Sequence, residues 1–169
     1  FFGSGSRIRE IDRNGTINTI AGIGVSGSSG DGGLAINAKI ARAHAVVVHG
    51  GPNQQVYELY LHNSHEYEQN KYSSEIRKID LKTGIINTIA GGQETGYSGD
   101  GGPAIDAKLG NEIRTIAVDD EGNIFFGGGS RIRKIDRNGT INTIAGTGVT
   151  GSSGDGGLAI NAQIAGGDA

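Results

Sequence analysis

The chain has 169 residues, a net charge of −3 at pH 7 and 32 glycines, but no cysteine. A chain of this length can bury a real core, the absence of cysteine excludes disulfides and cysteine-based metal sites, and the weakly acidic charge leaves no basic footprint for nucleic acid. The glycines show no Gly-X-Y period, which excludes collagen. No apolar stretch reaches the length that spans a bilayer, so no membrane insertion is expected.

Three related copies of one unit follow each other along the chain. Residues 1–45 return as residues 125–169 with eight differences, and a more distant copy lies between them. The sequence SGDGG occurs at residues 29–33, 98–102 and 153–157, and the equivalent residues Ile8, Ile76 and Ile132 are separated by 68 and then 56 residues. The basic unit therefore has 56 residues, with a net insertion of twelve in the middle copy. Self-similarity at a fixed period indicates a repeat architecture.

The last copy predicts four short antiparallel strands, because four segments combine β-branched and apolar residues between turn residues. These strands are expected at residues 114–119, 123–127, 131–136 and 140–145. The pair Asn138-Gly139 joins the last two strands, and Asn-Gly is a strong hairpin signal. Each unit ends in a glycine-rich loop that contains SGDGG and then a short helical turn, expected at residues 34–40 and 103–109.

The apolar residues of the strands indicate how the units pack. Ile8 and Ile11 fall on opposite faces of one strand, so that strand is covered on both sides. Four-stranded sheets covered on two faces are the blades of a β-propeller, and the predicted fold is therefore all-β. We expect a partial blade at residues 1–44, a middle blade at 45–113 with an insertion at 58–74, and a third blade plus long loop at 114–169. Three blades do not close a ring, which predicts an incomplete ring or an open array.

The motifs resemble the NHL repeat, in its form with a long GDGG loop. The matching residues are Gly-x-Ile-x-Thr-Ile-Ala-Gly, Ser-Gly-Asp-Gly-Gly, Ile-Ala-Val-Asp-x-x-Gly-Asn-Ile-Phe and Arg-Ile-Arg-Lys-Ile-Asp, over essentially the whole chain. This form is similar to repeats of large secreted or cell-surface proteins such as the teneurins. The resemblance implies a non-catalytic module in a longer extracellular protein, with an extracellular protein or glycan as partner. A second copy of the chain is a further expected partner, in a closed ring or a filament.

The SGDGG loops offer the residues Asp31, Asp100 and Asp155. Glycines supply positive φ angles and aspartate caps turns, so the expected role of these loops is structural. Calcium binding is the alternative, although the nine-residue spacing of known Gly-Asp calcium repeats is missing.

The insertion at residues 58–74 is expected to form a loop on the same side of the blades as the SGDGG loops. Loops held by a rigid scaffold often bind partners, and tyrosine is favoured in such surfaces. The alternative is a self-packed extension of a hairpin. The candidate binding residues are Tyr60, His62, His65, Tyr67 and Tyr72.

The four histidines, His44, His49, His62 and His65, all lie within residues 44–65, which raises the alternative of a metal site. His62 and His65 stand three residues apart in the insertion, and His49 takes the position that Asp119 has in the third blade. Some six-bladed propellers that this chain resembles are metal-dependent lyases or lactonases, so the resemblance also implies, as an alternative, a lyase or hydrolase that binds zinc or calcium near the central channel. No further catalytic constellation is present in the sequence.

Two remaining patterns recur between copies. The pairs Arg9/Asp12, Arg77/Asp80 and Arg133/Asp136 occur in every blade, which favours a structural role as charge pairs or as hydrogen bonds to neighbouring blades. Asn14 and Asn138 begin Asn-Gly-Thr sequons on expected hairpin turns, so they are candidate glycosylation sites, with a purely conformational role as the alternative.

Overall fold

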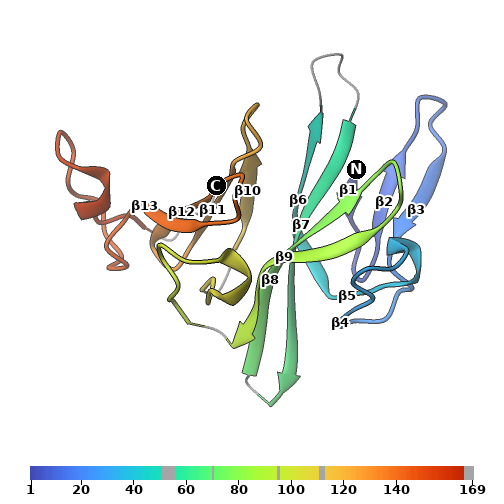
Figure 1. The fold of residues 1–169 in the computed structure, drawn as a ribbon, viewed down its shortest axis with the longest axis horizontal. Helices are drawn as coiled ribbons and strands as arrows, with labels where there is room; N and C mark the ends of the chain where they lie inside the picture. Colours follow the sequence, from blue (N-terminus) through green and yellow to red (C-terminus); the bar gives the residue numbers. More distant parts are fainter. Residues whose placement is uncertain (51–55, 70, 95, 111–112, 166–169) are drawn as a thin grey trace.

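The structure is a computed structural model that describes residues 1–50, 56–69, 71–94, 96–110 and 113–165. It is all-β: the three larger antiparallel sheets, one for each copy of the unit, stand side by side along the long axis of the molecule (Figure 1). The described strands form no closed barrel, and the predicted incomplete or open array of propeller-like blades is confirmed. The side chains of His44 and Tyr67 lie outside the described part.

In each sheet the strands follow chain order, as in an up-and-down blade. The first sheet contains β1 (Phe2–Gly3), β2 (Ile8–Ile11) and β3 (Ile17–Ala21). The second contains β6 (Arg42–Gly50), β7 (Val56–Glu68), β8 (Lys71–Asp80) and β9 (Ile86–Glu94). The third contains β10 (Thr115–Val118), β11 (Ile124–Gly128), β12 (Arg131–Ile135) and β13 (Ile141–Ala145), each at a place where the sequence predicts a strand.

Long connections follow the sheets and carry the expected helical turns. The turns are single 3₁₀ turns: η1 (Ala35–Asn37), η2 (Ala104–Asp106) and η3 (Ala159–Asn161). The first connection also holds the short strands β4 (Ser28–Ser29) and β5 (Lys39–Ile40), which pair with each other. Gly99 of the second connection has φ +95°, and a Cβ there would lie 2.7 Å from the Cβ of Ala107, so only glycine fits this close approach.

The insertion at residues 58–74 does not form the expected loop. It continues the ladder between β7 and β8 from the pair Glu58↔Asp80 to the pair Glu68↔Lys71. Its first residues are ordinary blade strand, since Leu61 faces Arg77 as Phe126 faces Arg133 in the third sheet. The loop prediction is wrong because the inserted residues pair with each other across β7 and β8 instead of leaving the ladder.

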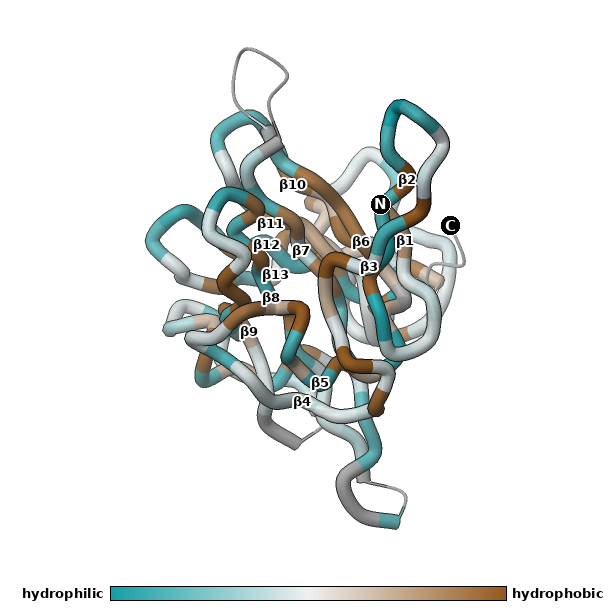
Figure 2. Tube along the Cα trace, turned by 90° about the vertical axis from the view of Figure 1, so that its right-hand side faces the viewer, coloured by the Kyte–Doolittle hydropathy of each residue, from teal (hydrophilic) through white to brown (hydrophobic). Residues whose placement is uncertain are grey.

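Two apolar cores lie between the sheets rather than inside any one of them. Each core joins one sheet, the loop that follows it and the next sheet, and Figure 2 shows the apolar strand segments inside with hydrophilic turns at the ends. The core between the first two sheets contains Ile8, Ala21, Ala35, Ala38, Ile40, Leu59, Leu61, Ile79 and Ile86. The core between the last two contains Tyr60, Ile76, Ala90, Ala104, Ala107, Leu109, Ile113, Ile124, Phe126, Ile135 and Ile141.

Candidate functional site

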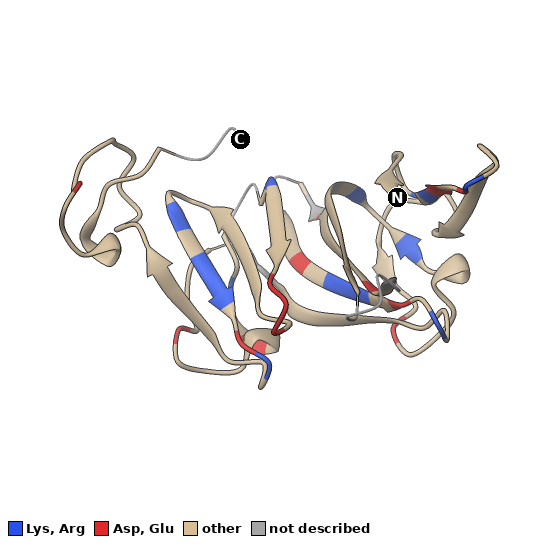
Figure 3. Cartoon of the chain, turned by 90° about the horizontal axis from the view of Figure 1, so that it is seen from above, with Lys and Arg blue, Asp and Glu red and all other residues tan. Residues whose placement is uncertain are grey.

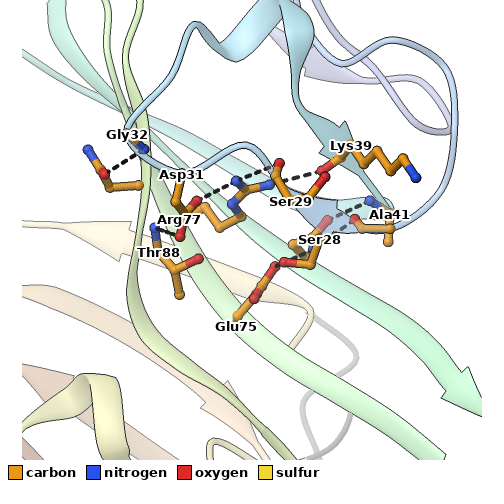
Figure 4. A network of polar contacts seen from close by, with 12 residues as sticks. Ser28, Ser29, Asp31, Gly32, Lys39, Ala41, Glu75, Arg77 and Thr88 are labelled. Atoms are coloured by element: carbon orange, nitrogen blue, oxygen red, sulfur yellow. Dashed lines mark hydrogen bonds and ion pairs between the residues drawn. The ribbon is translucent and has the colours of Figure 1, made fainter.

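A buried arginine ties the second sheet to the loop before it. Arg77 on β8 is buried and follows a β-bulge, which redirects side chains along a strand. Its guanidinium donates hydrogen bonds to the carbonyl oxygens of Lys39 (3.0 Å) and Ser29 (3.2 Å) and to a carboxylate oxygen of Asp31 (2.5 Å), as Figure 4 shows. The other carboxylate oxygen of Asp31 accepts the backbone N–H of Thr88 at 3.0 Å. One loop is thereby hydrogen-bonded to two strands of the following blade.

The third sheet repeats this arrangement with the second loop. Arg133 on β12 is buried and also follows a bulge. It donates to the carbonyl oxygens of Lys108 (2.8 Å) and Ser98 (3.0 Å) and to a carboxylate oxygen of Asp100 (2.6 Å). We call this set of contacts the arginine–loop lock: a third-strand arginine, the SGDGG aspartate of the preceding loop and two loop carbonyls.

The environment of the lock keeps its aspartates ionised. Partial burial pushes the pKa of Asp31 upward, but hydrogen bonds from Arg77 and Thr88 and the guanidinium charge outweigh it, so the pKa lies below its usual value. Partial burial also pushes the pKa of Asp100 upward. Hydrogen bonds from Tyr97, Thr143 and Arg133 outweigh this effect, so the pKa of Asp100 lies below its usual value.

The lock shows what the repeated Arg and Asp residues do in the second and third sheets. The arginines have the structural role of hydrogen-bonding a neighbouring blade, because Arg77 and Arg133 each bond the loop of the preceding blade. The strand-end aspartates instead close hairpin turns: Asp80 accepts the N–H of Lys82 at 2.8 Å and Asp136 accepts that of Asn138 at 2.9 Å. The SGDGG aspartates Asp31 and Asp100 bond the next blade, although the sequence predicts only capping of a local turn.

Polar contacts also fasten the base of the extended hairpin to the first loop. Asn63 and Glu75 are buried and face each other across β7 and β8. Asn63 accepts the N–H of Ala41 at 2.6 Å and donates to Glu75, which also accepts the hydroxyl of Ser28 (Figure 4). These bonds confirm that the insertion and the SGDGG loop lie on the same side of the blades.

The candidate binding residues of the insertion do not form one exposed surface. Tyr60 is buried and donates to Glu58 at 2.6 Å, and both burial and the nearby carboxylate raise its pKa. His62 is buried within hydrogen-bond distance of Ser74, at 3.0 Å. The expectation that Tyr60 and His62 are loop residues is thus wrong, because the hairpin ladder turns both toward the interior.

Toward the tip of the hairpin the same ladder exposes other residues. Tyr72 is exposed and pairs across the ladder with Glu66, which is also exposed. His65 is half-buried, with Nδ1 3.4 Å from the hydroxyl of Ser73. The side chain of Tyr67 lies outside the described part.

The candidate metal ligands serve separate local contacts. His49 lies 3.5 Å from Glu58 across β6 and β7. Asp119 closes the turn after β10 by accepting the N–H groups of Glu121 and Asn123, and the side chain of Asn123 is the main cause of its lowered pKa. Among the described residues, no group of three His, Asp or Glu side chains is placed to hold one metal ion.

Charged residues are spread along the described part of the chain. In Figure 3 the basic residues lie mainly along strands, and many acidic residues lie at turns and loops. The sequon residues Asn14 and Asn138 are both exposed at hairpin turns, so glycosylation stays a prediction. Within the described ranges, no helix has the length and apolar character that crossing a membrane requires.

Comparisons with known proteins support the resemblance seen in the motifs. Relatives that align with the chain include teneurin-1 of Gallus gallus (37% identical), Homo sapiens (35%) and Mus musculus (34%), each over 94 residues that make up 53% of this chain. The chain spans about 3% of the length of these relatives. Residues 93–164 match the family described as the teneurin NHL domain, so the similarity to NHL repeats of the teneurin type is confirmed over that part of the chain.

Proposed function

We propose that the chain is a non-catalytic β-propeller repeat module of a longer extracellular or cell-surface protein, where it binds protein or glycan and associates with further copies of itself. The observation that carries this proposal is the arginine–loop lock. In the lock, the recurring arginine and aspartate residues of the repeat hydrogen-bond one blade to the next, which is a structural role. The likeness to NHL repeats of secreted and cell-surface proteins supports the location and the absence of catalysis.

The outer part of the extended hairpin is the proposed binding surface. It interrupts an otherwise regular repeat, is rigidly paired along β7 and β8, and presents the exposed pair Tyr72 and Glu66. A tyrosine held on a strand contributes a large contact area at a small cost in conformational entropy. A metal-dependent lyase or hydrolase receives no comparable support, because His49 and Asp119 each contact their own neighbours.

Binding is tested with the labelled 169-residue protein on arrays of immobilised glycans and recombinant extracellular domains. Tyr72→Ala is expected to weaken any array signal by roughly tenfold or more, as for an exposed anchor residue. Tyr57→Ala is the matched control, because Tyr57 is an exposed tyrosine near the start of β7, far along the ladder from the tip. Equal binding of both variants, or no array signal for the wild type, would rule out the hairpin as the binding surface.

A further inference from the structure

The two SGDGG loops that dock on a following sheet differ at the residue directly before the motif. This residue is Ser28 in the loop that docks on the second sheet and Tyr97 in the loop that docks on the third. Ser28 pairs with Ile40 across its own loop. Tyr97 pairs with Leu109, which is the residue equivalent to Ile40. The serine and the tyrosine therefore leave the backbone at the same point of the loop and face the same part of the next blade.

The serine meets an acidic and buried site on the second sheet. Its hydroxyl donates to the carboxylate of Glu75, which is buried on β8 (Figure 4). Glu75 also accepts the side-chain amide of Asn63, the buried residue that faces it across β7 and β8. The amide and the carboxylate are thus satisfied by each other and by one small hydroxyl, as buried polar groups need to be. We call Ser28, Asn63 and Glu75 the serine joint.

The tyrosine meets a basic and half-buried site on the third sheet. Arg131 takes the place of Glu75, and the residue that faces it across β11 and β12 is Gly128 instead of an asparagine. The guanidinium of Arg131 lies over the Tyr97 ring, 3.8 Å from the ring centre. A cation over an aromatic face is attracted to it, and an acidic side chain in the same place is not. We call Tyr97, Gly128 and Arg131 the tyrosine joint.

The phenol group of Tyr97 also links the tyrosine joint to the arginine–loop lock. Its hydroxyl donates to Asp100 at 2.5 Å and is hydrogen-bonded to the hydroxyl of Thr143 on β13. The guanidinium of Arg133 lies 4.7 Å from the centre of the same ring. A serine side chain is too short to reach these groups, so the contacts of the tyrosine joint require the larger residue.

Neither loop residue suits the partner of the other. A tyrosine at position 28 would press its ring on the buried pair Asn63 and Glu75, and a serine at position 97 would leave the guanidinium of Arg131 without a ring. From this mismatch we propose that the residue before SGDGG and its partner on the next blade form a pairing code that selects the blade on which each loop docks. This inference goes beyond the proposed function, because it concerns the order of blades within one chain and not an external partner.

The other contacts between loop and blade do not distinguish the two loops. Both blades offer a loop the same lock arginine and the same buried isoleucines, which are Ile79 and Ile86 in the second sheet and Ile135 and Ile141 in the third. Docking of similar segments in the wrong order is a characteristic failure of repeat proteins. A difference in charge at one position of the blade, matched by a difference in the loop, opposes such wrong docking.

The sequence of each copy shows that the code acts between successive blades. The combinations of blade residue and loop residue within one copy are Arg7 with Ser28, Glu75 with Tyr97, and Arg131 with Ser152. No copy combines serine with glutamate or tyrosine with arginine. These matched combinations arise only where the loop of one copy meets the blade of the next, at the serine joint and the tyrosine joint.

Hydrogen–deuterium exchange of the intact 169-residue protein, followed by NMR, measures the docking of each loop separately. The N–H of Gly101 is hydrogen-bonded to Ile141 of the third sheet, and that of Gly32 to Ile86 of the second. Such groups exchange when the segment opens locally. Gly101 therefore reports on the tyrosine joint, and Gly32 reports on the serine joint as an internal reference.

Tyr97→Ser and Arg131→Glu each create a mismatched joint. Each single variant is expected to speed the exchange of Gly101 by about fivefold or more, with Gly32 unchanged, because the ring contact and its hydrogen bonds are lost. The double variant Tyr97→Ser/Arg131→Glu recreates the serine–glutamate combination, and a triple variant with Gly128→Asn adds the facing amide. Exchange of Gly101 is expected to be slower in the double or the triple variant than in both single variants.

Slower exchange in the combined variants separates a code from a simple contact. If Tyr97 and Arg131 only share one contact, its loss is counted once and the combined variants stay at least as fast as the single ones, which overturns the inference. Unchanged exchange in the single variants overturns it as well. Equal acceleration at Gly32 and Gly101 would show a loss of global stability alone, with the same conclusion. Arg13→Glu is the matched control, because it makes the same charge change at an exposed turn of the first blade and should leave both rates unchanged.

Discussion

Replacing Arg77 by methionine tests whether the arginine–loop lock holds the blades together. Methionine keeps an unbranched apolar stem of similar length but removes all three hydrogen bonds of the guanidinium. The same substitution at Arg9 is the matched control. Arg9 has the same local sequence, Ile-Arg-x-Ile-Asp, and the same bulge, but no described partner for its side chain.

The expected decrease in the free energy of unfolding follows from the hydrogen-bond partners that lose Arg77. An unsatisfied buried carbonyl costs about 1–3 kcal/mol, and Lys39 and Ser29 are surface residues, so water reduces this to about 1 kcal/mol each. The side chain of Asp31 is 45% exposed, and its ion pair therefore contributes no more than about 1 kcal/mol. Arg77→Met should destabilise the protein by about 3 kcal/mol, and Arg9→Met by less than about 0.5 kcal/mol.

Urea unfolding followed by circular dichroism measures the difference, at concentrations where the protein is monomeric. With a urea m-value of about 2 kcal/mol per M, the midpoint of Arg77→Met should fall by about 1.5 M and that of Arg9→Met by less than about 0.3 M. Equal midpoints for the two variants would refute the reasoning, because Arg77 is fully buried and bonds a loop, whereas Arg9 is half-buried and has no described loop contact.

Three further predictions concern the SGDGG loops and a glycine of β9. The pKa values of Asp31 and Asp100 lie below their unfolded values. The stability that these two carboxylates contribute is therefore fully present above about pH 4 and is lost as the pH falls through the folded-state pKa values. A melting temperature that stays constant down to about pH 2.5 would contradict this. Gly91→Ala should lower the free energy of unfolding by more than about 2 kcal/mol, because φ is +75° and the Cβ would lie 2.3 Å from the carbonyl oxygen of Ser74. Gly101→Ala, with φ +82° and open space around the Cβ, should lower it by about 1 kcal/mol. Chemical denaturation measures both values. Millimolar calcium, compared with chelator, should leave the melting temperature unchanged, because Arg77 and Thr88 already bond both oxygens of Asp31; a rise of more than about 3 °C would support calcium binding instead.

The blades themselves could be predicted from the sequence, because their causes are local. Alternating and β-branched segments, Asn-Gly turns and the glycines of the loops act over a few residues, and they place the strands of the third sheet almost where the structure has them. The repeat adds a second source of information, since each copy predicts the same strands independently.

The candidate site was less predictable, because it depends on pairing between distant segments. The insertion shows no turn signal that distinguishes a loop from a longer hairpin, and only the ladder between β7 and β8 buries Tyr60 and His62. A usable signal for the lock was present: the SGDGG loops at residues 29–33 and 98–102 each precede a strand with Ile-Arg-x-Ile-Asp. However, spacing alone does not show that Arg77 bonds Asp31 in the loop before its own sheet.

The sequence by itself thus determined the repeat, the four-stranded unit and the all-β class, since these follow from local periodicity and turn chemistry. Only the tertiary structure decided what each copy of a repeated residue does. Arg9, Arg77 and Arg133 share one sequence pattern, and two of them are hydrogen-bonded in the lock while the side chain of the third lacks a described partner. The physical reason is burial: a guanidinium is stabilised inside a protein only where neighbouring segments supply acceptors, and that supply depends on which blade packs against it.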